Sequence, residues 1–249
     1  MRPPANLFVL PAYNEEANIG RLLADLESRP ELYPEGSRVI VVDDGSEDGT
    51  ADVVAHYSGP LPVELVRLGH NQGPGAAFRA GFAAALAARP GDEVAFVVTL
   101  EADTTSDLDA LPEMLERAHA GAELVLADWR MVNVSRARRV LTHCAGWLVR
   151  HGLGLEAHTV SSFFRVYRTS VLETASQRYG DALIREAGFA CKAELLAKLS
   201  ALGARIEEVP VPLDWSRRQG ESKMPVLRTT LAYWRMLARI RSERAEVHA

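Results

Sequence analysis

Along the first half of the chain, short apolar runs alternate with segments whose apolar residues have helical spacing. The runs cover residues 7–10, 39–42, 63–66, 94–100 and 124–127. Each is rich in apolar residues and ends at a turn signal, which predicts buried strands. Apolar residues at helical spacing follow, from about residue 17, over 51–56, from about 76 to 89, and over 111–118. This alternation predicts parallel pairing with right-handed crossovers, and therefore an α/β fold.

The second half is less regular. The pattern predicts helices over residues 136–155 and 186–202 and strands over 163–167 and 206–211, and then a terminal amphipathic helix over 225–241. We see no internal repeat and no linker. The chain is therefore expected to form one α/β domain over residues 1–224, followed by the C-terminal helix and tail over 225–249.

Composition narrows the classes of protein. The 249 residues are 47% hydrophobic and 24% charged, which suits one large core. The net charge of −5 argues against nucleic acid as a partner. Cys144 and Cys191 are far apart, so we expect buried free thiols. No signal-peptide pattern and no membrane-length apolar run is present, so we expect a cytoplasmic protein.

Two acidic clusters directly follow predicted strands. Asp43 and Asp44 end one strand, and Glu101-Ala102-Asp103 ends another. If both strands are parallel in one sheet, these carboxylates emerge at its C-terminal edge, where open α/β sheets bind ligands. Glu101 and Asp103 would share one face, where Mg²⁺ or Mn²⁺ could join them to a diphosphate. The plainer interpretation is that both clusters are turn residues or solvated loops.

Other candidates are weaker when taken alone. Tyr13 could line a nucleotide pocket while Glu15 accepts hydrogen bonds, or it could simply pack on the core. Arg130, Arg217 and Lys223 lie in irregular segments, where charges are usually just solvated. A basic loop over residues 217–223 could instead close over phosphates and stabilise a leaving diphosphate.

The terminal helix combines apolar residues, including Trp234, with several arginines. Such a helix can lie on an anionic membrane surface. Its apolar side could equally pack on its own domain, on a membrane-protein partner or on a second subunit in a homodimer. The sequence leaves these alternatives open.

Taken together, the motifs resemble family 2 glycosyltransferases of the GT-A fold, and in particular the branch that mannosylates dolichol or polyprenol phosphate. The resemblance runs from about residue 7 to residue 224. The motifs are Pro11-Ala12-Tyr13-Asn14-Glu15, residues 41–50 (VVDDGSEDGT), residues 71–77 (NQGPGAA), Glu101-Ala102-Asp103, residues 164–168 (FRVYR), residues 207–211 (EEVPV) and residues 220–223 (GESK). Their order and spacing make the resemblance specific.

The resemblance implies a Rossmann-like, mainly parallel sheet with helices on both faces, and inverting transfer of a hexosyl group from GDP-mannose or a UDP-sugar to polyprenyl phosphate. The implied nucleotide-binding residues are Pro11, Tyr13, Glu15, Val42, Asp44, Glu101, Ala102 and Asp103. Glu101 and Asp103 would occupy the positions that bind Mg²⁺ or Mn²⁺. Arg130, Arg217 and Lys223 would contact the diphosphate and the acceptor phosphate. Glu101 stands where an aspartate is usual, so the metal-binding arm is one methylene longer.

Two other hypotheses compete with transfer to a lipid phosphate. A hydroxyl acceptor would need a general base, for which Glu186 is the candidate. The chain could also be a degenerate transferase that binds a nucleotide without catalysis, which the altered Glu101-Ala102-Asp103 motif suggests. Because an ionised phosphate acceptor needs no strong base, the lack of a recognisable catalytic histidine agrees with the first hypothesis.

Overall fold

The computed structural model describes residues 4–88, 94–131, 150–152, 154, 157–160, 162–213 and 231–240. Its strands are β1 (Ala5–Ala12), β2 (Arg38–Asp43), β3 (Val63–Arg67), β4 (Val94–Thr99), β5 (Leu124–Met131), β6 (Arg165–Arg168) and β7 (Ile206–Leu213). Its helices are α1 (Glu16–Glu27), α2 (Thr50–Ala55), α3 (Pro74–Ala87), α4 (Leu111–His119), α6 (Thr169–Tyr179) and α7 (Cys191–Ala201), with 3₁₀ turns at Pro30–Leu32, Leu108–Ala110 and Gly180–Leu183. Residues 231–240 form a further helix.

The described strands form one sheet in the order β3-β2-β1-β4-β6-β5-β7. Parallel pairs join β3 to β2, β2 to β1, β1 to β4, and β5 to β7. Among the strands that the structure describes, only β6 runs antiparallel, against both β4 and β5. Because the chain moves outward from β1 in one direction to β2 and β3 and later in the other to β4, the strand order reverses beside β1. That reversal is the position where open α/β sheets bind ligands.

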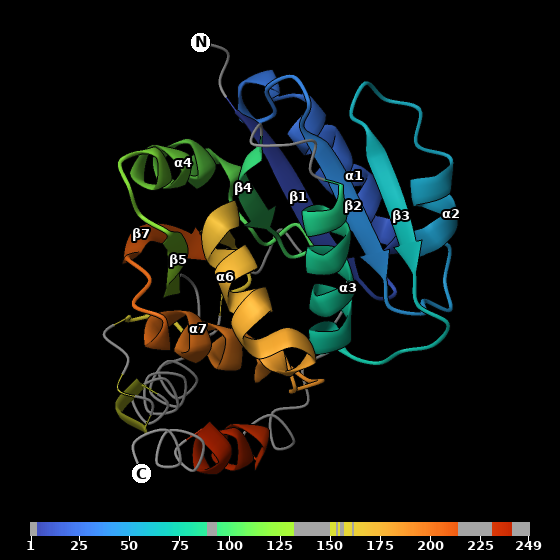
Figure 1. Cartoon of the computed structure of the whole chain (residues 1–249). Coiled ribbons are helices and arrows are strands. Elements are labelled where there is room, and N and C mark those ends of the chain that lie inside the picture. The colour runs from blue at the N-terminus through green and yellow to red at the C-terminus, as the bar shows by residue number, and fades with distance from the viewer. Residues whose placement is uncertain are drawn as a thin grey trace.

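Alternate residues of the strands supply two cores, one on each face of the sheet. On β1, Leu7 and Val9 face one core, and Phe8 and Leu10 face the other. Helices α3, α6 and α7 cover the first face, which is in front in Figure 1, and α1, α2 and α4 cover the second. Helices on both faces of a mainly parallel sheet confirm the α/β prediction.

Helix 231–240 packs on the domain through one side. Met236, Leu237 and Ile240 are buried in the first core, while Leu231 and Trp234 remain more than half exposed. The alternative in which the apolar side of the helix packs on its own domain is therefore confirmed for these three residues. Within the part of the chain that the structure describes, no helix is both long and apolar enough to cross a bilayer.

Several sequence-based expectations need correction. The sheet is mainly parallel, as the resemblance implies, and β6 is the antiparallel strand among those described. Strand β6 leads directly into α6, a helix that the sequence analysis missed. Helix α7 begins at Cys191 instead of residue 186, because residues 185–190 form a loop held by side-chain contacts. Most of the helix predicted over 136–155 and part of the one over 225–241 fall outside the described residues.

Candidate functional site

The two acidic clusters lie on either side of the end of β1. Ala12 pairs with Asp43 of β2, and Val9 pairs with Thr99, two residues before Glu101. With strands spaced about 4.8 Å apart, the clusters are separated by two strand spacings, roughly 10 Å. The structure thus brings together at one sheet edge the carboxylates that the sequence places 57 or more residues apart.

Asp44 holds the loop before α3. Its Oδ1 accepts a hydrogen bond from the backbone N–H of Gln72 and its Oδ2 accepts one from Gly73, both at 2.8 Å. The residue is only 3% exposed, and burial raises the pKa of its carboxyl group despite these two donors. By accepting hydrogen bonds from two backbone amides, the Asp44 carboxylate fixes the position of this loop over the sheet edge.

Asp43 and the loop after β1 are similarly tied together. Asp43 Oδ1 accepts a hydrogen bond from the Ser46 backbone N–H at 3.0 Å. Asn14, whose φ of 53° lies in the left-handed region, donates its N–H to Ser46 Oγ, and Glu15 donates its N–H to Thr50 Oγ1 at 2.7 Å. These bonds join the loop after β1 to the loop after β2, and so shape one continuous rim.

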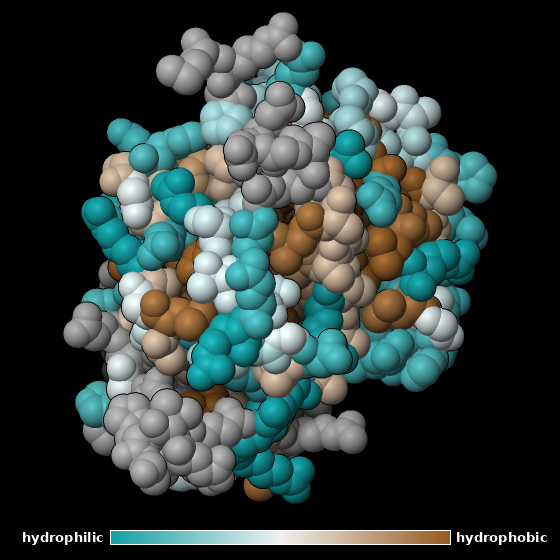
Figure 2. Space-filling view, in the orientation of Figure 1, coloured by the Kyte–Doolittle hydropathy of each residue, from teal (hydrophilic) through white to brown (hydrophobic). Residues whose placement is uncertain are grey.

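A cleft of about 540 Å³ opens beside this rim at the ends of β2 and β3. Its lining is Asp43, Gly45, Ser46, Glu47, Arg67, Leu68, Gly69, His70 and Asn71. The volume is within the range of small-molecule sites, and the lining provides both hydrogen-bond donors and acceptors. In the space-filling view, hydrophobic residues gather over the sheet beside α3, with polar residues around them (Figure 2).

Glu101 is anchored from two sides. Its Oε1 accepts a hydrogen bond from the Phe163 backbone N–H at 3.1 Å, and its Oε2 accepts one from Ser106 Oγ at 2.7 Å. Burial raises the pKa of Glu101, and the nearby charge of Asp103 raises it further. Asp103 Oδ1 accepts hydrogen bonds from the backbone N–H and the hydroxyl of Thr105.

These residues fit a divalent cation that arrives with a diphosphate. Among the described residues, no three His, Cys, Asp or Glu side chains gather into a ready-made metal cluster. Magnesium is usually held by one or two carboxylates together with substrate phosphates. Each Glu101 oxygen accepts one of the hydrogen bonds described above and still has a second lone pair. Asp103 and Glu101 therefore match the minimal protein share of such a site.

Lys192, which the sequence analysis missed, lies beside the candidate site. It is 8% exposed at the start of α7, and its Nζ lies 4.0 Å from the centroid of the Phe163 ring. Burial lowers the pKa of Lys192 to about 8, against the opposing effect of Glu101 and, more weakly, Asp103. In the sequence, Lys192 lies among apolar residues of a predicted helix. A charge in such a position is rarely buried without a partner, and this pattern could have identified Lys192.

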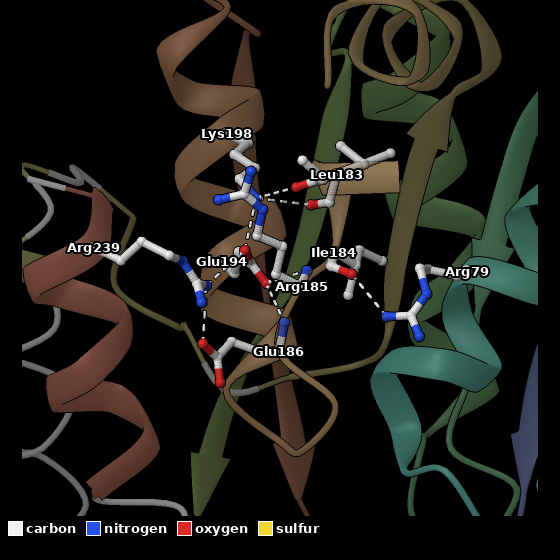
Figure 3. Close-up of polar contacts among 9 residues, drawn as sticks. Arg79, Leu183, Ile184, Arg185, Glu186, Glu194, Lys198 and Arg239 are labelled. Atoms are coloured by element: carbon white, nitrogen blue, oxygen red, sulfur yellow. Dashed lines mark hydrogen bonds and ion pairs between the residues drawn. The ribbon is translucent and has the colours of Figure 1, made fainter. Parts of the chain in front are cut away.

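Glu186, the candidate general base, takes part in an ionic network. Its Oε1 lies 2.9 Å from a guanidinium nitrogen of Arg239, and its backbone N–H donates to Glu194 Oε2 at 2.7 Å. The fully buried Glu194 also pairs with Lys198 at 2.6 Å and with Arg239 at 2.9 Å. Figure 3 shows Arg239 reaching from the C-terminal helix to both glutamates. The network ties that helix to the loop before α7.

The remaining predicted site residues are less fully placed. Pro11 and Tyr13 are half-buried at the end of β1, next to the rim, whereas the side chains of Val42 and Ala102 lie in the cores. Arg130 belongs to β5. Arg217 and Lys223 lie outside the described residues, so their predicted contacts with phosphate remain predictions.

Comparisons with known proteins show which family this chain is similar to. A family model described as "Glycosyl transferase family 2" matches residues 7–175. Undecaprenyl-phosphate mannosyltransferase of Micrococcus luteus is 32% identical, with the alignment covering 88% of this chain and 86% of the relative. Polyprenol monophosphomannose synthase of Mycolicibacterium smegmatis is 31% identical over 88% of this chain and 80% of the relative.

A solved structure is similar over nearly the whole chain. Glucosyl-3-phosphoglycerate synthase from Mycobacterium tuberculosis, in complex with Mn²⁺, UDP and its product, superimposes with a TM-score of 0.65. The alignment covers 96% of this chain and 79% of that one at 21% identity. At this identity the likeness shows the fold alone, and it confirms the predicted GT-A fold.

Proposed function

The chain belongs to glycosyl transferase family 2, and we propose that it transfers a hexosyl group from a nucleotide sugar to the phosphate of a polyprenol. Two relatives named for sugar transfer to such lipids align with most of this chain, which supports the acceptor. Both names specify mannose, so we propose GDP-mannose as the donor, and we propose that the transfer is inverting and metal-dependent.

The observation that carries the proposal is the pair of acidic clusters flanking the end of β1. We assign the nucleoside to the rim formed by the loops after β1 and β2, and the diphosphate to the edge after β4. The proposed nucleoside residues are Pro11, Tyr13, Glu15, Asp44 and, through its backbone alone, Val42, because the side chain of Val42 is buried in the core. Because the carboxylate of Asp44 is occupied by Gln72 and Gly73, its contribution includes the placement of that loop.

Asp103 and Glu101 would hold Mg²⁺ or Mn²⁺ at the diphosphate. The metal, when bound, neutralises charge that develops on the leaving nucleotide. We propose that Arg130, Arg217 and Lys223 contact the diphosphate and the acceptor phosphate and orient the acceptor for attack. The residues of this chain thus position two anionic substrates and balance their charge.

A phosphate acceptor also agrees with the state of Glu186. An ionised phosphate oxygen attacks without losing a proton, so the reaction needs no general base. A hydroxyl acceptor would need one, and the carboxylate of Glu186 is paired with Arg239 in this structure. Glu186 thus takes part in a contact with the C-terminal helix, which a phosphate acceptor leaves undisturbed.

The exposed side of the C-terminal helix supports a peripheral membrane contact. Leu231 is 57% exposed and Trp234 is 55% exposed, and they lie three residues apart on one helical face. A tryptophan at such a position suits the interface of a bilayer. We expect Trp234→Ser to weaken sedimentation with anionic vesicles. A change in the oligomeric state of this variant, with unchanged vesicle binding, would point to a partner subunit instead.

The test of the proposed function is label transfer from GDP- and UDP-sugars to polyprenyl phosphate, with Mg²⁺, Mn²⁺ or EDTA. We expect metal-dependent label in the organic phase, which Asp103→Asn abolishes and Glu186→Gln retains. Transfer to a hydroxyl acceptor that is lost in Glu186→Gln, without label on polyprenyl phosphate, would favour the hydroxyl-acceptor hypothesis. Absence of transfer from every donor, with nucleotide binding intact, would refute a lipid-phosphate acceptor, and absence of nucleotide binding as well would favour the degenerate-transferase hypothesis.

A further inference from the structure

Lys192 brings a positive charge to the acidic end of β4. The side chain enters from the first turn of α7, where its backbone carbonyl accepts a hydrogen bond from Arg165 at 3.0 Å. Its Nζ lies 4.0 Å from the ring centroid of Phe163 and 5.4 Å from that of Phe189. These two faces form a cation–π seat for the ammonium group.

Phe163 links this cation–π site to Glu101. The same Phe163 whose ring contacts the ammonium donates its backbone N–H to Glu101 Oε1 at 3.1 Å. Glu101 and Asp103 both favour the charged form of Lys192, and the nearby Arg165 opposes it. Because the ring of Phe163 contacts the ammonium and its backbone N–H bonds to Glu101, the ammonium is held beside the two carboxylates proposed to hold the metal.

We propose that Lys192 is an internal counter-cation of the Glu101–Asp103 pair, and that its charge limits how tightly this sheet edge binds a divalent cation before the donor arrives. The proposal extends the proposed function, because it concerns the same metal position. A diphosphate would add the negative charge that outweighs Lys192, so the metal would bind tightly only together with the donor.

The expected effect follows from Coulomb's law. A unit charge within roughly 8 Å of a divalent cation, even at the dielectric constant of water, changes the cation's affinity by about fivefold. Partial burial lowers the effective dielectric constant and enlarges the effect. Removal of the ammonium should therefore tighten Mn²⁺ binding to the nucleotide-free protein by about fivefold or more.

The experiment compares Lys192→Met with Lys192→Arg at pH 8, by calorimetry or by the paramagnetic signal of free Mn²⁺. Arginine remains charged at this pH, so the comparison excludes titration of the lysine itself. We expect tighter Mn²⁺ binding in Lys192→Met than in Lys192→Arg without nucleotide, and tight binding in both variants once UDP or GDP is saturating. Asp103→Asn serves as the control that loses the metal.

The outcomes separate this inference from the proposed function. Equal or weaker Mn²⁺ binding in folded Lys192→Met would overturn the inference, even if sugar transfer to polyprenyl phosphate is observed. Failure of Mn²⁺ to bind any variant, with or without nucleotide, would overturn it as well. Tighter binding in Lys192→Met without transfer to a lipid would support the inference while refuting the proposed acceptor. Thermal unfolding of each variant establishes that it is folded.

Discussion

Gly75 is the position where one added methyl group should disturb the site most directly. It lies in the first turn of α3, and its backbone N–H donates to the Ala187 carbonyl at 2.8 Å. A Cβ at this position would lie 1.9 Å from the carbonyl oxygen of Glu186 and 3.1 Å from Cα of Ala187. Both are backbone atoms, so no flexible side chain can move aside.

The size of the effect follows from this geometry. Ordinary contact begins near 3.4 Å, so the two loops would have to separate by about 1.5 Å. Forced overpacking of this kind costs about 1–3 kcal/mol, and loss of the hydrogen bond to Ala187 adds about 1 kcal/mol. The better helix propensity of alanine returns at most about 1 kcal/mol. We therefore expect Gly75→Ala to lower the free energy of unfolding by about 1–3 kcal/mol.

The assay is urea unfolding, paired with calorimetric titration of GDP and UDP in the presence of Mn²⁺. Because the adjacent Gln72 and Gly73 hold the carboxylate of Asp44, displacement of the loop should also weaken nucleotide binding. Gly188→Ala is the matched control, since a Cβ there meets nothing within 4 Å. If Gly75→Ala were as stable as Gly188→Ala and bound nucleotide equally well, the proposed role of this loop contact would be refuted.

Three further predictions concern buried charged or titratable groups. Arg239→Met should lower the free energy of unfolding in urea by about 2 kcal/mol, because Glu186 and the buried Glu194 lose a partner, whereas the exposed Arg235→Met should have little effect. Cys191 is 2% exposed, and burial raises its pKa to about 12, so iodoacetamide at pH 8 should label it only after unfolding, as peptide mass mapping would show. Burial lowers the folded-state pKa of Lys192 from 10.5 to about 8, so the folded chain releases this proton at a lower pH than the unfolded chain does. The free energy of unfolding should therefore rise between those pH values by up to ~1.4 kcal/mol per pH unit. Urea titrations of Lys192→Met at several pH values should lack this rise.

The sequence predicted the structure best where a single strand has a recognisable local pattern. The segments before Asp43 and Glu101 each combine a short apolar run with an acidic turn, so both the strands and their common edge could be predicted. The direction of β6 could not, because alternation along a strand does not specify which neighbour it pairs with or in which direction. Helix α6 follows β6 without a turn signal, and it was therefore missed.

Long-range partners account for most of what the sequence could not provide at the site. Asp44 finds its two donors 28 and 29 residues away, and Glu186 finds Arg239 on the last described helix. No local sequence pattern indicates either of these pairings. The burial of Lys192 has the same origin, since Phe163 and Glu101 come from segments distant in sequence. Chemistry at the ends of strands was therefore predictable, whereas the charge balance around it was not.

The longer side chain at position 101 has a physical explanation in these contacts. An aspartate would end about one C–C bond, ~1.5 Å, short of the position that the glutamate carboxylate occupies. From that position Glu101 accepts hydrogen bonds from both Phe163 and Ser106, and so ties the end of β4 to the segment before β6. Asp103 lies two residues further along the chain, and its Oδ1 accepts hydrogen bonds from the backbone N–H and the hydroxyl of Thr105. Glu101 thus holds the backbone of Phe163, whose ring contacts Lys192, and in the proposed function it would share the metal with Asp103. The departure from an aspartate at position 101 is therefore compatible with a working site.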